Sequence, residues 1–212
     1  MKKIVLTLMV GAFLLMATGA MAMTINGSLW QDVEISDDGA NVDNSSDWLL
    51  DLKPTYDANA TFTVSELDFG SQSYVTYDQF LNSPTWLTGA SYKDTFTSYS
   101  GFNGTLFEFT GVAQFDADFS VRHDDGFWMT LSQNGEEVYK FDYSRNVSPT
   151  LTELGVIAGV YDFDILYAAT NGFPEYLQVT GMSAPVPEPS TILLLGSGLL
   201  GLGWYGRKRK KA

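Results

Sequence analysis

A pair of adjacent carboxylates, Asp124 and Asp125, is the feature of this sequence best suited to chemistry. Gly126 follows the pair, and apolar residues alternate with polar ones on both sides, which predicts a tight turn between two strands. Adjacent carboxylates supply charge and hard oxygen ligands, of which calcium takes six to eight. An Asp-Asp-Gly sequence also forms a turn without any ion, when an aspartate bonds its own backbone. A turn alone and a turn that holds calcium therefore both stay open.

The other chemistry-bearing residues give weaker signals. His123 is the only histidine and there is no cysteine, which excludes disulfides and thiol nucleophiles and leaves His123 without partners for a zinc site. The acidic segment 32–47 lacks the residue order of a helix–loop–helix calcium site, which favours a solvated loop. No nucleophile elbow, phosphate-binding glycine loop or identifiable pair of glycosidase carboxylates is present. We therefore expect no enzyme, with a glycan hydrolase as the weakest alternative.

The charge balance points to cations as partners. The chain of 212 residues has 12 Lys and Arg against 25 Asp and Glu, a formal net charge of −13. Seven of those basic residues lie in the two terminal segments 1–22 and 188–212, so the middle of the chain is more acidic still. Nucleic acid binding requires a basic face, so we expect no nucleic acid partner.

Short stretches of period-two alternation predict the elements that must position the Asp-Asp pair. We expect an all-β, jelly-roll-like antiparallel β-sandwich over 61–182, preceded by an irregular acidic part over 23–60 and including one helical turn within 77–87. Asn134-Gly135 predicts a two-residue hairpin turn. The alternating apolar stripes are Phe119 and Val121; Phe127, Met129 and Leu131; Tyr139, Phe141 and Tyr143; Tyr161, Phe163, Ile165 and Tyr167; and Leu177 and Val179.

Both ends of the chain have the composition of targeting segments. Residues 1–22 combine two lysines, an apolar run and Ala20-Met21-Ala22, which predicts a signal helix removed by signal peptidase. Residues 191–206 carry no charge and are followed by five basic residues at 207–211, which predicts a single short transmembrane helix with a cytoplasmic tail. The domain between these segments is expected outside the inner membrane.

The C-terminal segment resembles a known sorting signal. Val186, Pro187, Glu188 and Pro189 stand directly before the apolar run and the basic tail. This order, over 183–212, resembles the PEP-CTERM signal of exopolysaccharide-producing Gram-negative bacteria. The resemblance implies that an exosortase recognises the motif at 186–189, so that the protein is its substrate.

The globular part resembles the protective-antigen-type β-sandwich, on the strength of the strand, acidic turn, strand and hairpin over 119–135. In calcium-dependent lectins of that type, such an Asp-Asp pair holds a calcium ion that meets sugar hydroxyls. The resemblance implies that role for Asp124 and Asp125, with Asn171 as a further oxygen ligand by loop analogy. Phe127 or Trp128 would stack on the sugar ring.

Two functions of different classes follow. The first is a non-catalytic protein of the cell surface or extracellular matrix, sorted by exosortase and associated with exopolysaccharide or biofilm. The second is a calcium-dependent carbohydrate-binding adhesin. In both, the protein crosses the inner membrane, is anchored by its C-terminal helix before processing, and ends at the cell surface or outside the cell.

Overall fold

The computed structural model describes residues 23–34, 48–71, 75–89, 95–96, 103–143, 150–169, 175–186 and 198. The sandwich lies within one compact unit, Ala22–Pro185. The predicted signal helix at 1–22 and the predicted transmembrane helix at 191–206 fall outside the described residues, apart from Gly198. Within the described ranges, no helix combines the length and the apolar composition that crossing a membrane requires.

The unit is built almost wholly of antiparallel strands, which confirms the predicted all-β sandwich. The strands are β1 (Ile25–Glu34), β2 (Ala60–Val64), β3 (Asp68–Ser71), β4 (Val75–Thr76), β5 (Thr85–Thr88), β6 (Thr95–Phe96), β7 (Asn103–Asp124), β8 (Phe127–Gln133), β9 (Glu136–Tyr143), β10 (Thr150–Gly155), β11 (Gly159–Ala169) and β12 (Glu175–Ser183). Two short helices, α2 (Trp48–Leu52) and α3 (Tyr77–Phe80), complete the described elements. A capping box between Thr76 and Gln79 begins α3 inside the stretch expected to hold a helical turn.

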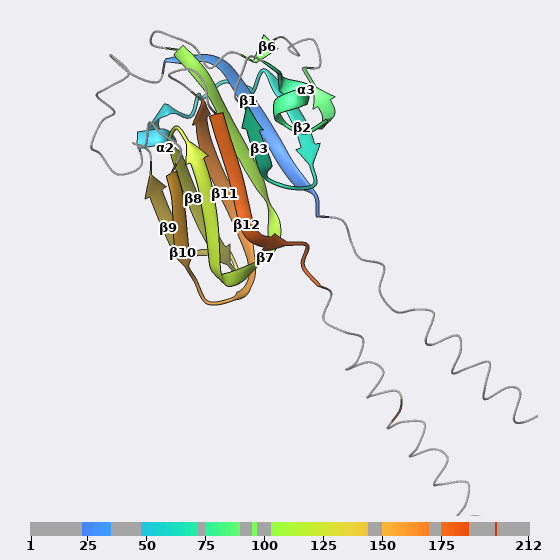
Figure 1. Cartoon of the computed structure of the whole chain (residues 1–212), viewed down its shortest axis with the longest axis vertical. Helices are drawn as coiled ribbons and strands as arrows, with labels where there is room; N and C mark the ends of the chain where they lie inside the picture. Colours follow the sequence, from blue (N-terminus) through green and yellow to red (C-terminus); the bar gives the residue numbers. More distant parts are fainter. Residues whose placement is uncertain are drawn as a thin grey trace, which may run out of the picture. The chain divides into compact units, whose positions relative to one another are not determined.

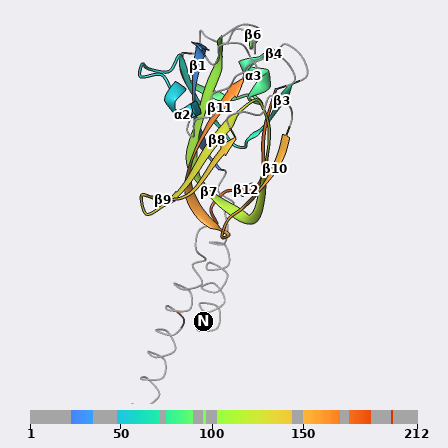
Figure 2. The same ribbon diagram turned by 90° about the vertical axis from the view of Figure 1, so that its left-hand side faces the viewer.

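Strand β7 belongs to both layers of the sandwich (Figure 1). Its first half pairs with β1 and β11 in the layer ordered β5-β2-β1-β7-β11-β8-β9. Its second half pairs with β10 and β12, and β12 also pairs with β3. Figure 2 shows β7 bending back at one end of the sandwich to pass from the first layer to the second. One continuous strand therefore joins the two layers.

The two ends of the sandwich chain lie close together, near the bend of β7. At the start of β1, Asn26 pairs with Thr110, and at the end of β12, Ser183 pairs with Gln114. The last residue of β7, Asp124, instead pairs with Tyr176 at the start of β12. The chain therefore enters and leaves the sandwich at the end opposite to the Asp124–Asp125 turn (Figure 1).

The structure corrects the expected boundary of the sandwich. Residues 23–60 were expected to be irregular, yet β1 lies between β2 and β7 inside the first layer. Consecutive residues Leu29 and Trp30 are both buried, because each faces a different apolar cluster. A strand covered on both faces shows no clean alternation, which is why its sequence gives a weak strand signal.

The inner core is dominated by aromatic side chains. Buried rings contact one another across the two layers, as when Phe69 of β3 lies 5.5 Å from Phe109 of β7 and Phe115 lies 5.1 Å from Phe119 between ring centroids. A second cluster covers the outer face of the first layer, where Leu49 of α2 packs with Trp30, Leu106, Trp128 and Leu166. These two clusters fix β11, the strand that supports the Asp-Asp turn.

Candidate functional site

The Asp124–Asp125 turn connects the two layers of the sandwich. Asp124 ends β7 opposite Tyr176 of β12, in the second layer. Phe127 begins β8 opposite Tyr167 of β11, in the first layer. The peptide bond between Asp124 and Asp125 is cis. The predicted strand, turn, strand order is thus present, and the turn lies at one end of the sandwich.

The two carboxylates occupy a poorly hydrated position. Asp124 and Asp125 are each only 5% exposed. The pKa of Asp124 is raised to about 7, first by burial and then by the neighbouring Asp125, while Arg122 acts in the opposite direction. Two adjacent buried carboxylates repel each other in their charged forms, so a cation beside them stabilises both.

The main-chain carbonyls of the turn are held by donors from the protein interior. The Tyr167 hydroxyl donates to the Asp124 carbonyl. His123 Nδ1 lies 2.7 Å from the Asp125 carbonyl oxygen, and the Ala168 N–H donates to the Gly126 carbonyl at 3.0 Å. All three carbonyl oxygens of the turn therefore have hydrogen-bond partners.

Two fully buried residues beneath the turn were missed by the sequence analysis. Tyr167 was expected only as one member of an apolar stripe, and Glu175 was not singled out. The Tyr167 hydroxyl oxygen lies 2.7 Å from Glu175 Oε2, and Glu175 is the first residue of β12. Burial, followed by the Glu175 carboxyl, raises the pKa of Tyr167 well above its usual value, so its hydroxyl keeps its proton. An acidic residue at a strand start gives no sequence signal of full burial.

His123 is a core residue with hydrogen-bond partners. It is completely buried, and its ring lies 4.6 Å from the Phe127 ring between centroids. Burial lowers its pKa, against the effect of the hydrogen bond to the Asp125 carbonyl. The neutral ring therefore donates from Nδ1, and Nε2 lies 3.5 Å from the Thr152 hydroxyl.

The structure contradicts the expected sugar-stacking role of Phe127 and Trp128. Phe127 is fully buried, and its ring stacks on Tyr143 at 5.3 Å between centroids. Trp128 is 5% exposed and packs in the outer cluster with Leu166. Both rings are used in packing because β8 is covered on both faces, so neither offers an open face to a ligand.

The donor chemistry of the turn fits calcium, although the described residues supply only part of a shell. Two carboxylates are hard oxygen donors, as calcium prefers. Over the described part of the chain, no group of three or more Asp, Glu, His or Cys residues is placed to hold a metal ion. Asn171 lies outside the described residues, as do Pro187, Glu188 and Pro189 of the predicted sorting motif, whereas Val186 is described and 73% exposed.

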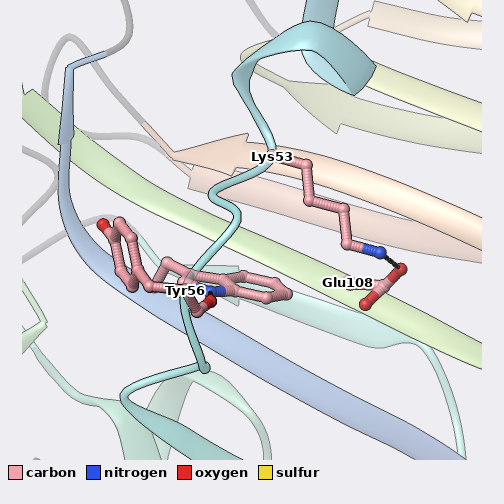
Figure 3. A network of polar contacts seen from close by, with 4 residues as sticks. Lys53, Tyr56 and Glu108 are labelled. Carbon is pink, nitrogen blue, oxygen red and sulfur yellow. Dashed lines mark hydrogen bonds and ion pairs between the residues drawn. The ribbon is translucent and has the colours of Figure 1, made fainter.

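A second polar cluster lies on the outer face of the first layer. The Lys53 ammonium forms an ion pair with the Glu108 carboxylate (Figure 3). Close by, the indole N–H of Trp30 donates to the Tyr56 carbonyl at 3.1 Å. Burial and the nearby Glu108 raise the pKa of Asp164 to about 6, while Lys53 lowers it. These contacts hold the segment after α2 against the sheet.

Comparison with known proteins identifies the C-terminal motif. The family model for the PEP-CTERM protein-sorting motif matches residues 185–210, which confirms the predicted sorting signal. No curated protein matches the chain by sequence.

Comparison with solved structures identifies the fold of the globular part. The PA14 domain of the antifreeze protein MpAFP is similar with a TM-score of 0.50 and 18% identity, covering 81% of this chain and 86% of that one. A PA14 sugar-binding domain from an RTX adhesin has a TM-score of 0.48 and 16% identity, covering 78% of this chain and 100% of that one. The epithelial adhesin 9 A domain of Candida glabrata, in complex with Galβ1-3GlcNAc, has a TM-score of 0.46 and 10% identity, covering 78% and 84%. The first of these likenesses shows that the sandwich has a PA14-like fold.

Proposed function

We propose that this chain is an exported, non-catalytic surface protein that binds glycans through a calcium ion held at the Asp124–Asp125 turn. The observation that carries the proposal is the position of two adjacent carboxylates, each 5% exposed, at one end of a PA14-like sandwich. Their mutual repulsion and loss of hydration are relieved when a divalent cation binds beside them.

Residues of the turn and of its surroundings would supply different ligands to the ion. Asp124 and Asp125 would give the ion its charged oxygen ligands, and Asn171 with water would supply others. When bound, the ion offers its remaining coordination positions to neighbouring hydroxyls of a sugar. Because Phe127 and Trp128 are buried, recognition would depend on hydroxyl geometry more than on ring stacking.

The sorting motif supports the exported location. A signal peptidase would remove residues 1–22, and an exosortase would recognise the motif at 186–189 while the C-terminal helix holds the protein in the inner membrane. The chain would then reside at the cell surface or in the extracellular matrix, where exopolysaccharide of a biofilm is the available glycan. The strongly acidic composition suits an environment rich in divalent cations.

The decisive experiment is thermal unfolding of the full chain, solubilised in detergent, with calcium, with magnesium and with chelator. Calcium that binds only the folded state stabilises it by about 2.7 kcal/mol at a hundredfold excess over its dissociation constant. The double variant Asp124→Asn with Asp125→Asn is expected to lose that stabilisation.

A matched control removes the same charge elsewhere on β7. Asp116 and Asp118 are exposed on the same strand, so Asp116→Asn with Asp118→Asn should leave the calcium response unchanged. A glycan array probed with and without calcium then tests sugar binding. Equal calcium responses in the two double variants would refute the assignment of the site.

A further inference from the structure

The hydrogen bonds of the turn restrict what it can offer an ion. The donors to the Asp124 and Asp125 carbonyls, Tyr167 and His123, are both fully buried. The third donor is the main-chain N–H of Ala168, inside β11. Each carbonyl of the turn therefore accepts a hydrogen bond from a group of the protein interior, and the two carboxylates are the charged oxygen groups of the turn.

We propose that Tyr167 and His123 are positioning residues for the ion, because they hold the turn by its carbonyls and so restrict the positions that the two aspartate carboxylates can take. This inference rests on the proposed calcium site. Neither residue touches the ion, and each acts through the backbone of an aspartate. Groups that orient ligands in this way contribute to metal affinity by restricting the ligands to a binding geometry.

Tyr167 is well placed for this role because its own position is fixed. Its ring stacks on Phe107 at 6.0 Å and on Phe80 at 6.4 Å between centroids. On its other side the hydroxyl contacts Glu175, at the start of β12. The single hydroxyl thus connects β11, the end of β7 and the start of β12, the three strand segments that surround the turn.

The test compares two tyrosines of the same strand. Tyr161 is also buried in β11, and its hydroxyl donates to the Ile157 carbonyl at 2.6 Å, away from the turn. Tyr167→Phe and Tyr161→Phe each remove one hydroxyl that donates to a main-chain carbonyl, so both should lower the melting temperature. Only Tyr167→Phe should weaken calcium binding, by about tenfold or more.

The measurement is calorimetric titration of calcium chloride into the detergent-solubilised full chain, at a temperature where every variant is folded. A second pair of variants decides the matter if Tyr167→Phe does not fold. His123→Asn places an amide donor near the position of Nδ1 and should keep most of the affinity, whereas His123→Leu has no donor and should lose it.

The outcomes separate this proposal from the proposed function. Calcium affinity that is unchanged in both Tyr167→Phe and His123→Leu would overturn the positioning role and leave the calcium site intact. An unmodified chain that binds no calcium, or a double Asp124→Asn and Asp125→Asn variant that binds it normally, would overturn both.

Discussion

Asp164 is a carboxylate that the fold holds at an energetic cost. It lies on β11, and its Oδ1 atom is buried with no hydrogen-bond partner among the described residues. Its pKa is raised from 3.8 to about 6, first by burial and then by Glu108. The folded state therefore binds the proton more tightly than the unfolded state does, and ionisation of Asp164 opposes folding.

We expect Asp164→Asn to stabilise the protein above pH 6. Because the folded pKa lies above the unfolded one, the penalty is absent below about pH 4, grows between pH 4 and 6, and is fully present above that range. Allowing for partial exposure of the residue, the gain at pH 8 should be roughly 1–2 kcal/mol. Denaturant unfolding of both proteins at pH 4 and pH 8 measures it.

The neighbouring Asp162 supplies the control. It lies two residues away on the same face of β11 but is exposed, so water already screens its charge. Asp162→Asn should change the free energy of unfolding little at either pH. A gain for Asp164→Asn that is as large at pH 4 as at pH 8 would show that charge is not its cause.

At the scale of elements, the β8–β9 hairpin depends on the conformation of two residues. Asn134 has φ 54° and Gly135 has φ 80°, the left-handed pair of a two-residue turn. A Cβ added at Gly135 would meet nothing within 4 Å. Any loss of stability on replacing this glycine therefore comes from its backbone conformation and not from steric contact with the rest of the fold.

Gly135→Ala should accordingly destabilise the protein by about 1 kcal/mol, because an L-residue is disfavoured at positive φ. Gly155 of β10 also has open space around its Cβ position, but its φ is not in the left-handed region. Gly155→Ala should change the free energy of unfolding by less than about 0.5 kcal/mol. Equal effects of the two substitutions, measured by denaturant unfolding, would contradict the assignment of the turn.

At the scale of the whole molecule, folding and sorting are assigned to different parts of the chain. The compact unit runs over Ala22–Pro185, and the sorting motif matches residues 185–210. Changes confined to the motif should leave the stability of the sandwich unchanged but should alter the final location of the protein in the cell.

We expect Pro187→Ala with Pro189→Ala to leave the protein in the inner membrane, since these two prolines belong to the motif that an exosortase would recognise. Cell fractionation with an antibody against the sandwich measures the distribution. Pro54→Ala with Pro84→Ala, two prolines outside the motif, is the control and should reach the surface normally. Normal surface arrival of the double variant would contradict recognition through these prolines.

The sequence predicted the strands in which large apolar residues recur at every second position. The stripes of β8, β9 and β11 and the turn at Asn134-Gly135 are present as expected. The signal failed for β1, where Leu29 and Trp30 are both buried. The apolar residues Leu29, Trp30 and Val33 do not follow a regular period-two alternation, so the pattern did not reveal this strand.

The candidate site could likewise be predicted only in those residues that form a local sequence pattern. Asp124 and Asp125 were identifiable because adjacent acids at a turn are a local pattern. The burial of Phe127 and Trp128, and the contacts of Tyr167 and Glu175, depend on residues distant in the chain. Sequence spacing carries no record of such contacts, so the supporting residues became visible only in the structure.

The placement of the chain ends at the bend of β7 has a mechanical consequence. A glycan held at the turn would pull on Asp124, at the end of β7, while an attachment through residue 186 would pull on the opposite end of the neighbouring strand, β12. Antiparallel strands drawn apart from opposite ends are loaded in shear, so the hydrogen bonds between β7 and β12, which lie across the strands, share the force together. Under the proposed function, a force between a bound glycan and the C-terminal attachment would therefore pass through the β7–β12 ladder in shear.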